Sequence, residues 1–205
     1  AEVPAQQIAD AFLEAVQQAR RTLGSAVTSV IWTRHHAVKG ERTRLEETVL
    51  EGSPVLREEL HVDGQPPLRF EVHPRAFFQP NTLQAEILYA EVARAANLPA
   101  ADAPHGTVLD LYCGTGTIGL VLAPRAARVI GIELQPDAVD NARGNALRND
   151  ITHATFHAGD VGKLLGDPEV VPPGPVDVAV VDPPRSGLMP AALEHLAGLE
   201  ARRLV

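Results

Sequence analysis

The chain has 205 residues, and 45% of them are hydrophobic, which excludes an intrinsically disordered composition. Cys113 is the single cysteine, so an internal disulfide and a cysteine-based metal site are excluded, and we expect a reducing, cytoplasmic location. No apolar run approaches the roughly 18 residues that a membrane span needs. The formal net charge of −8 argues against nucleic acid as a partner, although a net sum hides local fields.

The N-terminal part alternates between helical and extended patterns. Apolar residues recur at helical spacing over 6–23 and predict an amphipathic helix, while the apolar run over 26–32 predicts a strand. Two further strands are expected at 58–62 and 68–72, on either side of a short loop. We therefore predict a small α+β accessory domain over residues 1–75.

A basic run lies between Arg34 and Arg44, where His35, His36 and Lys39 accompany the arginines. Such a run is typical of a solvated face, and the run alone favours this interpretation. The alternative is a patch that contacts phosphates.

The pattern changes at Asn81, which can cap a helix, with Gln84 three residues later as in a capping box. We expect an apolar stripe to be the buried face of this helix, and the stripe comprises Leu83, Ile87, Leu88 and Val92. Phe77 and Phe78 precede the cap, and we expect both to pack under the helix.

From residue 106, strands alternate with helices. The predicted strands cover 107–112, 128–133, 154–160 and 176–182, and the principal helix covers 136–149. Repeated βα units with apolar strands imply a parallel sheet with helices on both faces. We predict an α/β domain over 76–205, in which the fourth strand lies at an open edge of the sheet.

A glycine-rich loop follows the first strand of this domain and opens a helix. Gly114, Gly116 and Gly119 fit the pattern G-x-G-x-x-G, in which glycines permit a tight turn and a close approach of backbone N–H groups to a ligand. The pattern alone does not separate folds that bind NAD, FAD or S-adenosylmethionine.

Three acidic residues near successive strand ends narrow the choice. Glu133 can accept both hydroxyls of a ribose, and Asp160 can accept a hydrogen bond from an adenine amino group. Asp110, just before the glycines, suits the ammonium of a methionine moiety and would repel a pyrophosphate. The three acids together favour S-adenosylmethionine; for each one alone, a capping or loop role is the alternative.

The fourth strand ends in Asp182-Pro183-Pro184-Arg185. Two consecutive prolines fix a rigid turn at the carboxyl edge of the sheet, where open α/β folds bind their ligands. Together with the glycine loop, this sequence indicates a methyltransferase that acts on a nucleic-acid base.

With these motifs the chain resembles the RNA uracil-5-methyltransferase family over about residues 70–205. The matching segments are FFQPNT (77–82), LDLYCGTGTIGL (109–120), VIGIE (129–133), DAVDNARGNA (137–146) and DPPRSGL (182–188). The resemblance implies a Rossmann-like class I methyltransferase sheet, of which strands 1–4 are present, preceded by the small α+β domain. It also implies S-adenosylmethionine-dependent methylation of uridine C5 in RNA, with tRNA favoured over rRNA.

The resemblance further implies which residues contact the cofactor. These are Gln79, Tyr112, Thr117, Glu133 and Asp182, to which the glycine loop adds Gly114 and the third strand adds Asp160. Thr117 stands where some members of the family carry Asn.

The family's nucleophilic cysteine and base glutamate have no counterpart here, and we expect both to follow Val205, so the chain as given is expected to be an inactive fragment. The cysteine thiolate of the family adds to carbon 6 of uracil, and the glutamate removes the proton from carbon 5. Cys113 lies inside the cofactor loop, where we expect it to pack or to contact the cofactor.

Three other functions remain open: a methyltransferase for another RNA base, a noncatalytic module that binds cofactor or RNA, and a nicotinamide-dependent oxidoreductase. We expect no metal, because the pair His35-His36 lacks a third ligand nearby. A monomer is expected.

Overall fold

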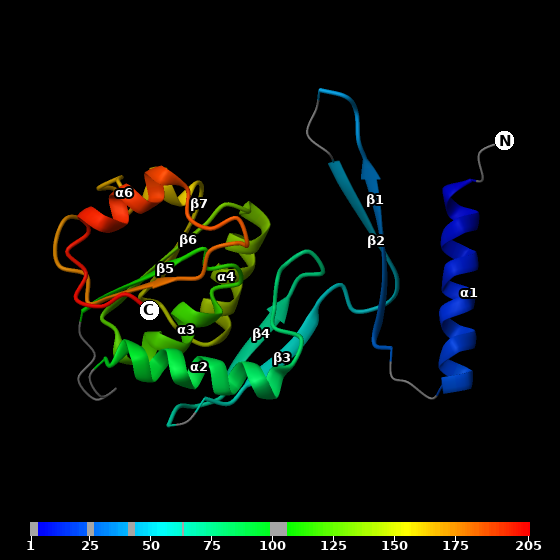
Figure 1. Ribbon diagram of the computed structural model, residues 1–205. Helices are drawn as coiled ribbons and strands as arrows, with labels where there is room; N and C mark the ends of the chain where they lie inside the picture. The colour runs from blue at the N-terminus through cyan, green and yellow to red at the C-terminus, as the bar shows by residue number, and fades with distance from the viewer. Residues whose placement is uncertain (1–3, 24–26, 41–43, 63, 99–105) are drawn as a thin grey trace. The chain divides into compact units, whose positions relative to one another are not determined.

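The computed structural model describes residues 4–23, 27–40, 44–62, 64–98 and 106–205 (Figure 1). The chain divides into two compact units, Ala1–Leu56 and Arg57–Val205, which we describe separately. Within the described residues, no helix combines the length and apolar character that crossing a membrane requires.

The first unit contains one helix and one antiparallel strand pair, namely α1 (Ala5–Leu23), β1 (Ser29–His36) and β2 (Arg44–Gly52). The helix predicted over 6–23 is confirmed. The strand predicted over 26–32 begins later and runs through the basic residues to His36, and residue 26 lies outside the described part. Strand β2 was not predicted.

The second unit begins with a two-stranded sheet of β3 (Leu56–Leu60) and β4 (Leu68–Val72), which confirms the predicted strand pair. Side chains alternate along both strands: Leu60, Leu68 and Phe70 are buried in the core. This strand pair packs with the α/β part, and the division between the two compact units falls between Leu56 and Arg57. The assignment of domains to residues 1–75 and 76–205 stays a prediction.

Helix α2 (Thr82–Ala96) begins at Asn81, whose side chain accepts a hydrogen bond from Gln84 N, as predicted. The prediction of its buried face was wrong for three of four residues: Leu83, Ile87 and Leu88 are exposed, and only Val92 packs against the core. The buried face comprises Ala85, Tyr89, Ala93 and Ala96. Alanines allow the helix backbone to lie close to its neighbours, so small residues occupy the packed face.

The α/β part confirms the predicted parallel sheet and the α/β fold class. The strands are β5 (Thr107–Leu111), β6 (Arg128–Glu133), β7 (Ala154–Ala158) and β8 (Val178–Val181). They form one sheet in the order β7-β6-β5-β8, and the pairs β5–β6, β5–β8 and β6–β7 are all parallel. The remaining helices are α3 (Thr117–Leu122), a 3-10 turn (Ala123–Arg125), α4 (Pro136–Arg148), α5 (Val161–Leu164) and α6 (Pro190–Gly198).

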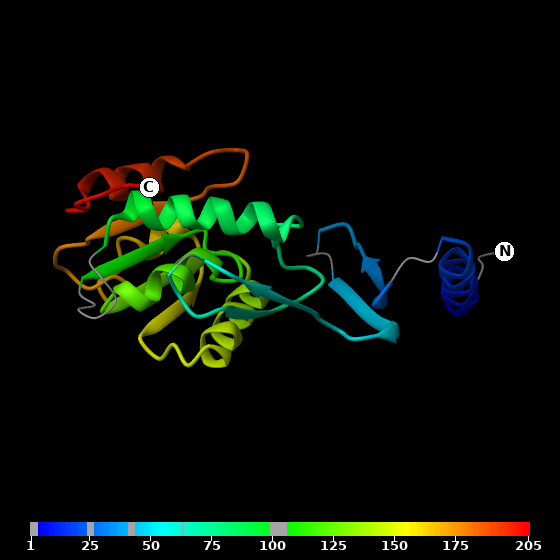
Figure 2. The ribbon, with the colours of Figure 1, turned by 90° about the horizontal axis from the view of Figure 1, so that it is seen from below.

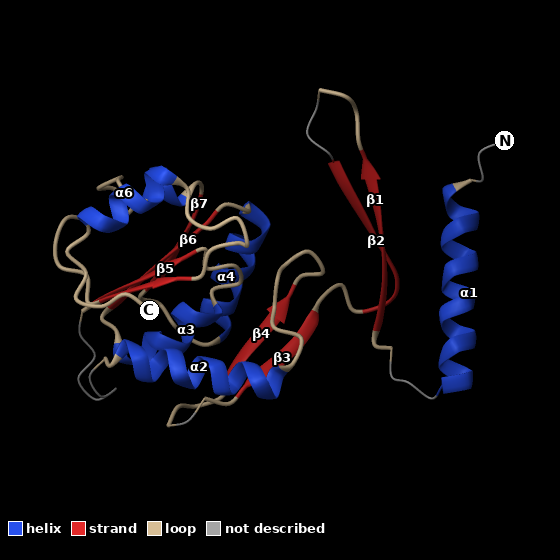
Figure 3. Ribbon diagram, viewed as in Figure 1, coloured by secondary structure: helices blue, strands red, loops and turns tan. Residues whose placement is uncertain are grey.

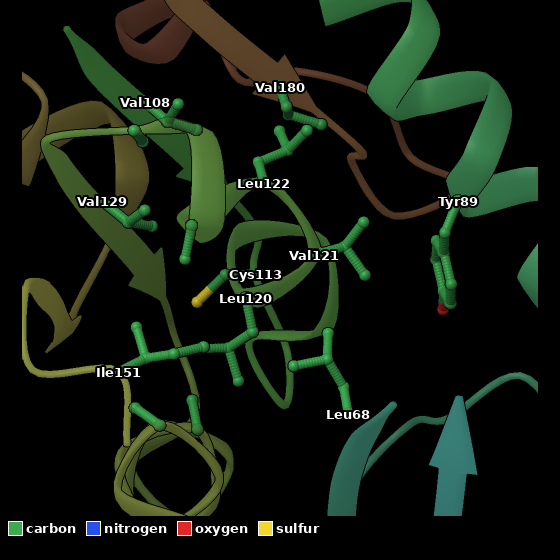
Figure 4. Packing of buried hydrophobic residues seen from close by; sticks show 14 of the residues in the cluster. Leu68, Tyr89, Val108, Cys113, Leu120, Val121, Leu122, Val129, Ile151 and Val180 are labelled. Atoms are coloured by element: carbon green, nitrogen blue, oxygen red, sulfur yellow. The ribbon is translucent and has the colours of Figure 1, made fainter. Parts of the chain in front are cut away.

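Helices cover both faces of this sheet (Figures 2 and 3), and a hydrophobic cluster lies on each face. On one face Val108, Val129 and Val180 pack with α2, α3, α4 and the β3–β4 strand pair (Figure 4). On the other face Leu109 and Ile130 pack with α5 and α6. The alternation along each strand fills both clusters, as expected for a sheet covered on both sides.

Three asparagines of α4 and its C-terminal cap pair with the backbone of β4. The Oδ1 atoms of Asn149, Asn145 and Asn141 accept from the backbone N of Arg69, Glu71 and His73 at 2.8, 2.9 and 3.3 Å. Four helical residues rise about 6 Å and two strand residues about 6.6 Å, so the two spacings nearly match. A helix thus occupies the free side of a strand.

The last residues of the chain lie beside β8. Ala179 N donates to Arg203 O at 3.0 Å, and Val181 N donates to Val205 O at 2.9 Å, in a parallel arrangement. The expectation that β8 lies at the edge of the sheet is confirmed, but the edge is not fully open, because residues 201–205 satisfy part of it.

Candidate cofactor and base site

The glycine loop leaves the sheet at Tyr112, whose φ of 65° lies in the left-handed region. Its backbone N donates to Ile132 O at 2.8 Å, which ties the turn to β6. Gly116 has a φ of 77°, and a Cβ there would lie 2.8 Å from the Phe156 ring. The tight turn therefore requires glycine at residue 116 both for its conformation and for its space.

Two carboxylates accept hydrogen bonds from the backbone of this loop and of the helix that follows it. Asp110 Oδ2 accepts from Gly119 N at 2.7 Å, and Glu133 Oε2 accepts from Gly114 N at 3.2 Å. The pKa of Asp110 is raised to about 7, mainly by burial and also by the charges of Asp182 and Glu133, while the bond from Gly119 N opposes this. Asp110 thus braces the start of α3 as well as bordering the cavity described next.

A cavity of about 60 Å³ lies between α2, the glycine loop and the end of β8. Of the predicted site residues, it brings together Gln79, Tyr112, Gly114, Thr117 and Asp182. Its other lining residues are Phe77, Phe78, Leu88, Tyr89, Asp110, Cys113, Thr115 and Ile118. Three segments distant in the sequence, within 77–89, 110–118 and at Asp182, therefore meet at the carboxyl edge of the sheet.

Glu133 and Asp160 do not line this cavity and lie at the ends of β6 and β7. Asp160 is exposed and caps α5, with its Oδ1 accepting from Lys163 N at 3.1 Å. Glu133 Oε1 accepts from Gln135 N at 2.9 Å. Asp160 therefore makes a capping contact, which was the alternative to a role in ligand binding. Binding of a cofactor by Glu133 or Asp160 stays a prediction.

Tyr89 borders the cavity and was not singled out from the sequence. Its side chain is 5% exposed and forms a hydrogen bond with Thr117. The pKa of Tyr89 is raised to about 12, mainly by burial and also by the nearby carboxylates of Asp182 and Asp110. The sequence could have indicated Tyr89, because it is the single large residue with a polar group among the alanines on the buried face of α2 (Figure 4).

The two phenylalanines before α2 differ. Phe78 packs against Phe70, with ring centroids 5.7 Å apart, as expected for a residue under the helix. Phe77 is 69% exposed, so the prediction that it packs under the helix was wrong. Because Phe77 lines the cavity, it presents an apolar face at its mouth.

Cys113 is buried in the core between the loop and β6. Burial raises the pKa of its thiol well above the usual value, and Asp110 and Glu133 raise it further. A thiol in this environment stays protonated, so Cys113 contributes packing and lacks the character of a nucleophile. Among the described residues, no group of three His, Cys, Asp or Glu side chains is arranged to hold a metal ion.

The segment after β8 is the outer rim of the site. Asp182 and Arg185 are exposed. Asp182 N donates to Leu111 O at 3.5 Å, and Gly187 N donates to Pro184 O at 2.8 Å. The two prolines are thus followed by a turn that lies beside the cavity and is closed by a backbone hydrogen bond.

Comparison with known proteins identifies this part of the chain. The family described as "Methyltransferase domain" matches residues 102–196. A protein of Caldanaerobacter subterraneus named as an uncharacterised RNA methyltransferase is 46% identical over 130 residues, which are 63% of this chain and 27% of that protein. The tRNA (uracil-5-)-methyltransferase homolog A of Mus musculus is 48% identical over 122 residues, which are 56% of this chain and 18% of that protein.

A solved structure gives the same assignment. The tRNA (uracil-54, C5)-methyltransferase of Pyrococcus abyssi, in complex with S-adenosyl-L-homocysteine, matches with a TM-score of 0.59 and 27% sequence identity. The match covers 85% of this chain and 39% of that chain, so the present chain spans less than half of each of these relatives. The chain therefore contains a methyltransferase domain and is similar to RNA methyltransferases, among them the tRNA (uracil-5-)-methyltransferase homologues.

Proposed function

We propose that this chain is the S-adenosylmethionine-binding part of an RNA methyltransferase that methylates carbon 5 of uridine, with tRNA favoured over rRNA as the substrate. The observation that carries the proposal is the meeting of Gln79, Tyr112, Thr117 and Asp182 around one cavity at the carboxyl edge of the sheet. The cavity adjoins the glycine loop, beyond which Glu133 and Asp160 end the next two strands.

The residues present fit this cofactor. Asp110 and Asp182 border the cavity, and Glu133 lies close enough to raise the pKa of Asp110, so the site concentrates negative charge. Carboxylates attract a sulfonium and an ammonium group, and they repel the pyrophosphate of a dinucleotide. A Cβ on Gly114 would meet no other atom within 4 Å, so the loop backbone is open to close approach by a ligand.

The size of the cavity indicates which part of the cofactor it would hold. The cavity is small, with a volume of about 60 Å³. We place the methionine end of the cofactor there and the adenosine along the sheet edge, where Glu133 would accept from the ribose hydroxyls and Asp160 from the adenine amino group. When bound, the cofactor supplies an electrophilic methyl group.

The remaining chemistry needs residues that this chain does not provide. A thiolate would add to carbon 6 of uracil, carbon 5 would take the methyl group and lose its proton to a base, and the thiolate would then leave. The buried, protonated Cys113 does not fit the thiolate's role. We propose that the nucleophilic cysteine and the base glutamate lie elsewhere in the longer protein, after Val205.

The rim after β8 would contact the uridine of the RNA substrate. A uridine in a stacked loop must turn out of its stack to reach the cofactor. Asp182 lies at the mouth of the cavity and would accept a hydrogen bond from the base or hold the cofactor's charge, while the two prolines fix its position. We further propose that the protein is a cytoplasmic monomer.

Calorimetry tests the cofactor assignment. We expect S-adenosylhomocysteine to bind and NADH not to bind; binding of NADH alone would overturn the assignment in favour of an oxidoreductase. The full-length protein, incubated with labelled S-adenosylmethionine and tRNA or rRNA, should produce 5-methyluridine detectable by nucleoside mass spectrometry. A methylated base other than 5-methyluridine would support the alternative methyltransferase.

A further inference from the structure

Asn145 lies in the last turn of α4, and its side chain is completely buried. Its Nδ2 donates to the backbone O of Thr115 at 3.3 Å. Its Oδ1 accepts from Glu71 N at 2.9 Å and from Arg148 Nη1 at 3.0 Å. The orientation of the amide is fixed because a donor lies on one side of it and a carbonyl acceptor on the other.

The contact to Thr115 continues into the wall of the cavity. The hydroxyl groups of Thr115 and Thr117 are 2.9 Å apart, and both residues are buried. Thr117 in turn forms a hydrogen bond with Tyr89, and all three residues line the cavity. A continuous series of polar contacts therefore runs from the backbone of β4, through Asn145 and the glycine loop, to α2.

We propose that Asn145 is a positioning residue that sets the glycine loop against β4 and thereby holds the cavity in the shape that binds the cofactor. The effect on cofactor affinity rests on the function proposed above; the effect on the loop itself does not. A buried amide that bridges two backbone segments fixes their separation, because either segment would lose a hydrogen bond by moving away.

The two other asparagines of the same series provide a natural control. Asn149 donates from Nδ2 to Arg69 O at 2.7 Å and accepts from Arg69 N, but its hydrogen bonds within the described residues stay with β4 and with α4 itself. Asn141 likewise pairs with the backbone of residues 71 and 73. Among the described contacts of this series, the one to the glycine loop is made by Asn145.

A matched pair of variants separates positioning from stability. In Asn145→Asp the carboxylate still accepts from Glu71 N, but it cannot donate to Thr115 O. In Asn149→Asp the carboxylate still accepts from Arg69 N, but it cannot donate to Arg69 O. Each variant therefore loses a donor in the same series, and only the first loses the contact to the loop.

Two measurements are made on both variants: calorimetric titration with S-adenosylhomocysteine, and amide hydrogen exchange without ligand. For Asn145→Asp we expect the dissociation constant to rise about tenfold, as for the loss of one buried hydrogen bond. We also expect faster exchange at Gly114 and Gly116. For Asn149→Asp we expect an affinity within about twofold of the parent and faster exchange confined to β4.

The outcomes are distinct. Unchanged affinity and unchanged loop exchange in Asn145→Asp overturn the inference, as does an equal loss of affinity in Asn149→Asp. If the parent protein binds no S-adenosylhomocysteine, the proposed function fails, and exchange at the glycine loop alone decides the inference. If Asn145→Asp does not fold, Asn145→Ala with Asn149→Ala as its control repeats the comparison without a buried carboxylate.

Discussion

The glycine loop and the rim after β8 border the same cavity, but they are held in different ways. Side chains from three elements anchor the loop: Asp110 of β5, Glu133 at the end of β6 and Asn145 of α4. For the rim, the described hydrogen bonds are the two backbone bonds of Asp182 and Gly187. The loop owes its shape to its neighbours, whereas the rim owes its shape to two prolines and its own backbone.

This difference indicates that the two sides of the site tolerate change differently. A substitution in the loop disturbs buried hydrogen bonds and packing, so it should alter stability and ligand binding together. A substitution in the exposed rim touches few buried groups, so it should alter binding with little change in stability. The following experiments test this contrast in order of decreasing effect.

Substitution of Gly116 by alanine should produce a large loss of stability. The residue has a φ of 77°, and a Cβ would lie 2.8 Å from the Phe156 ring and 3.0 Å from Ala142 Cβ. Left-handed strain and overpacking together should lower the free energy of unfolding by about 3 kcal/mol, measured by urea denaturation. Gly114→Ala is the control, because its φ is also positive but no atom lies within 4 Å of the added Cβ. Equal losses for the two variants would contradict the packing part of the argument.

Asp110 should make stability fall as the pH rises. Its pKa is raised to about 7 in the folded protein, mainly by burial, from 3.8. Below pH 3.8 both states are protonated, whereas between pH 3.8 and 7 only the unfolded state ionises, so unfolding becomes easier across this window.

The matching experiment compares the parent with Asp110→Asn by urea denaturation at pH 5 and pH 8. The amide oxygen can still accept from Gly119 N, but it does not titrate. Relative to the variant, the parent should lose roughly 2–3 kcal/mol between the two pH values. If the difference in the free energy of unfolding between the parent and the variant stays constant with pH, the pKa of Asp110 is not raised in the folded protein.

Asp182→Asn tests the rim. The side chain is exposed and borders the cavity, so removal of its charge should weaken binding of S-adenosylhomocysteine about tenfold, as measured by calorimetry, while the melting temperature changes little. A large fall in melting temperature would mean that the rim is anchored as firmly as the loop.

Tyr89→Phe should give the smallest effect. The variant keeps the ring in the core and removes the hydroxyl that bonds with Thr117. We expect a loss of about 1 kcal/mol in the free energy of unfolding and a modest loss of ligand affinity. Tyr89→Ala serves as the contrast, because it also removes the ring from the core and should cost about 3–5 kcal/mol.

Much of the α/β part was predictable from the sequence because its signals are local. Strand alternation, the cap at Asn81 and the glycine pattern each lie within a few residues, and each found its expected place. Parallel strands bring their carboxyl ends to one edge, so Tyr112 and Asp182 could be expected to meet.

The features that were missed depend on partners distant in the chain. The apolar stripe of α2 contains larger hydrophobic side chains than its buried face, so periodicity alone selected the wrong side; the close approach of alanines to the core decides it. Asn145 looks in the sequence like an ordinary polar residue of a helix. Its role emerges when β4 and Thr115, 74 and 30 residues away, lie on either side of it.

The asparagine series also bears on how this protein avoids self-association. The free side of a strand presents unpaired N–H and C=O groups, which can recruit a strand from another molecule. These groups at residues 69 and 71 of β4, and the N–H of residue 73 just after it, are already engaged by side-chain amides of α4 and its C-terminal cap. The side-chain amide of asparagine has the same kinds of donor and acceptor as a peptide group. The asparagines therefore pair with the free side of β4 in place of a third strand, so that another molecule cannot pair there.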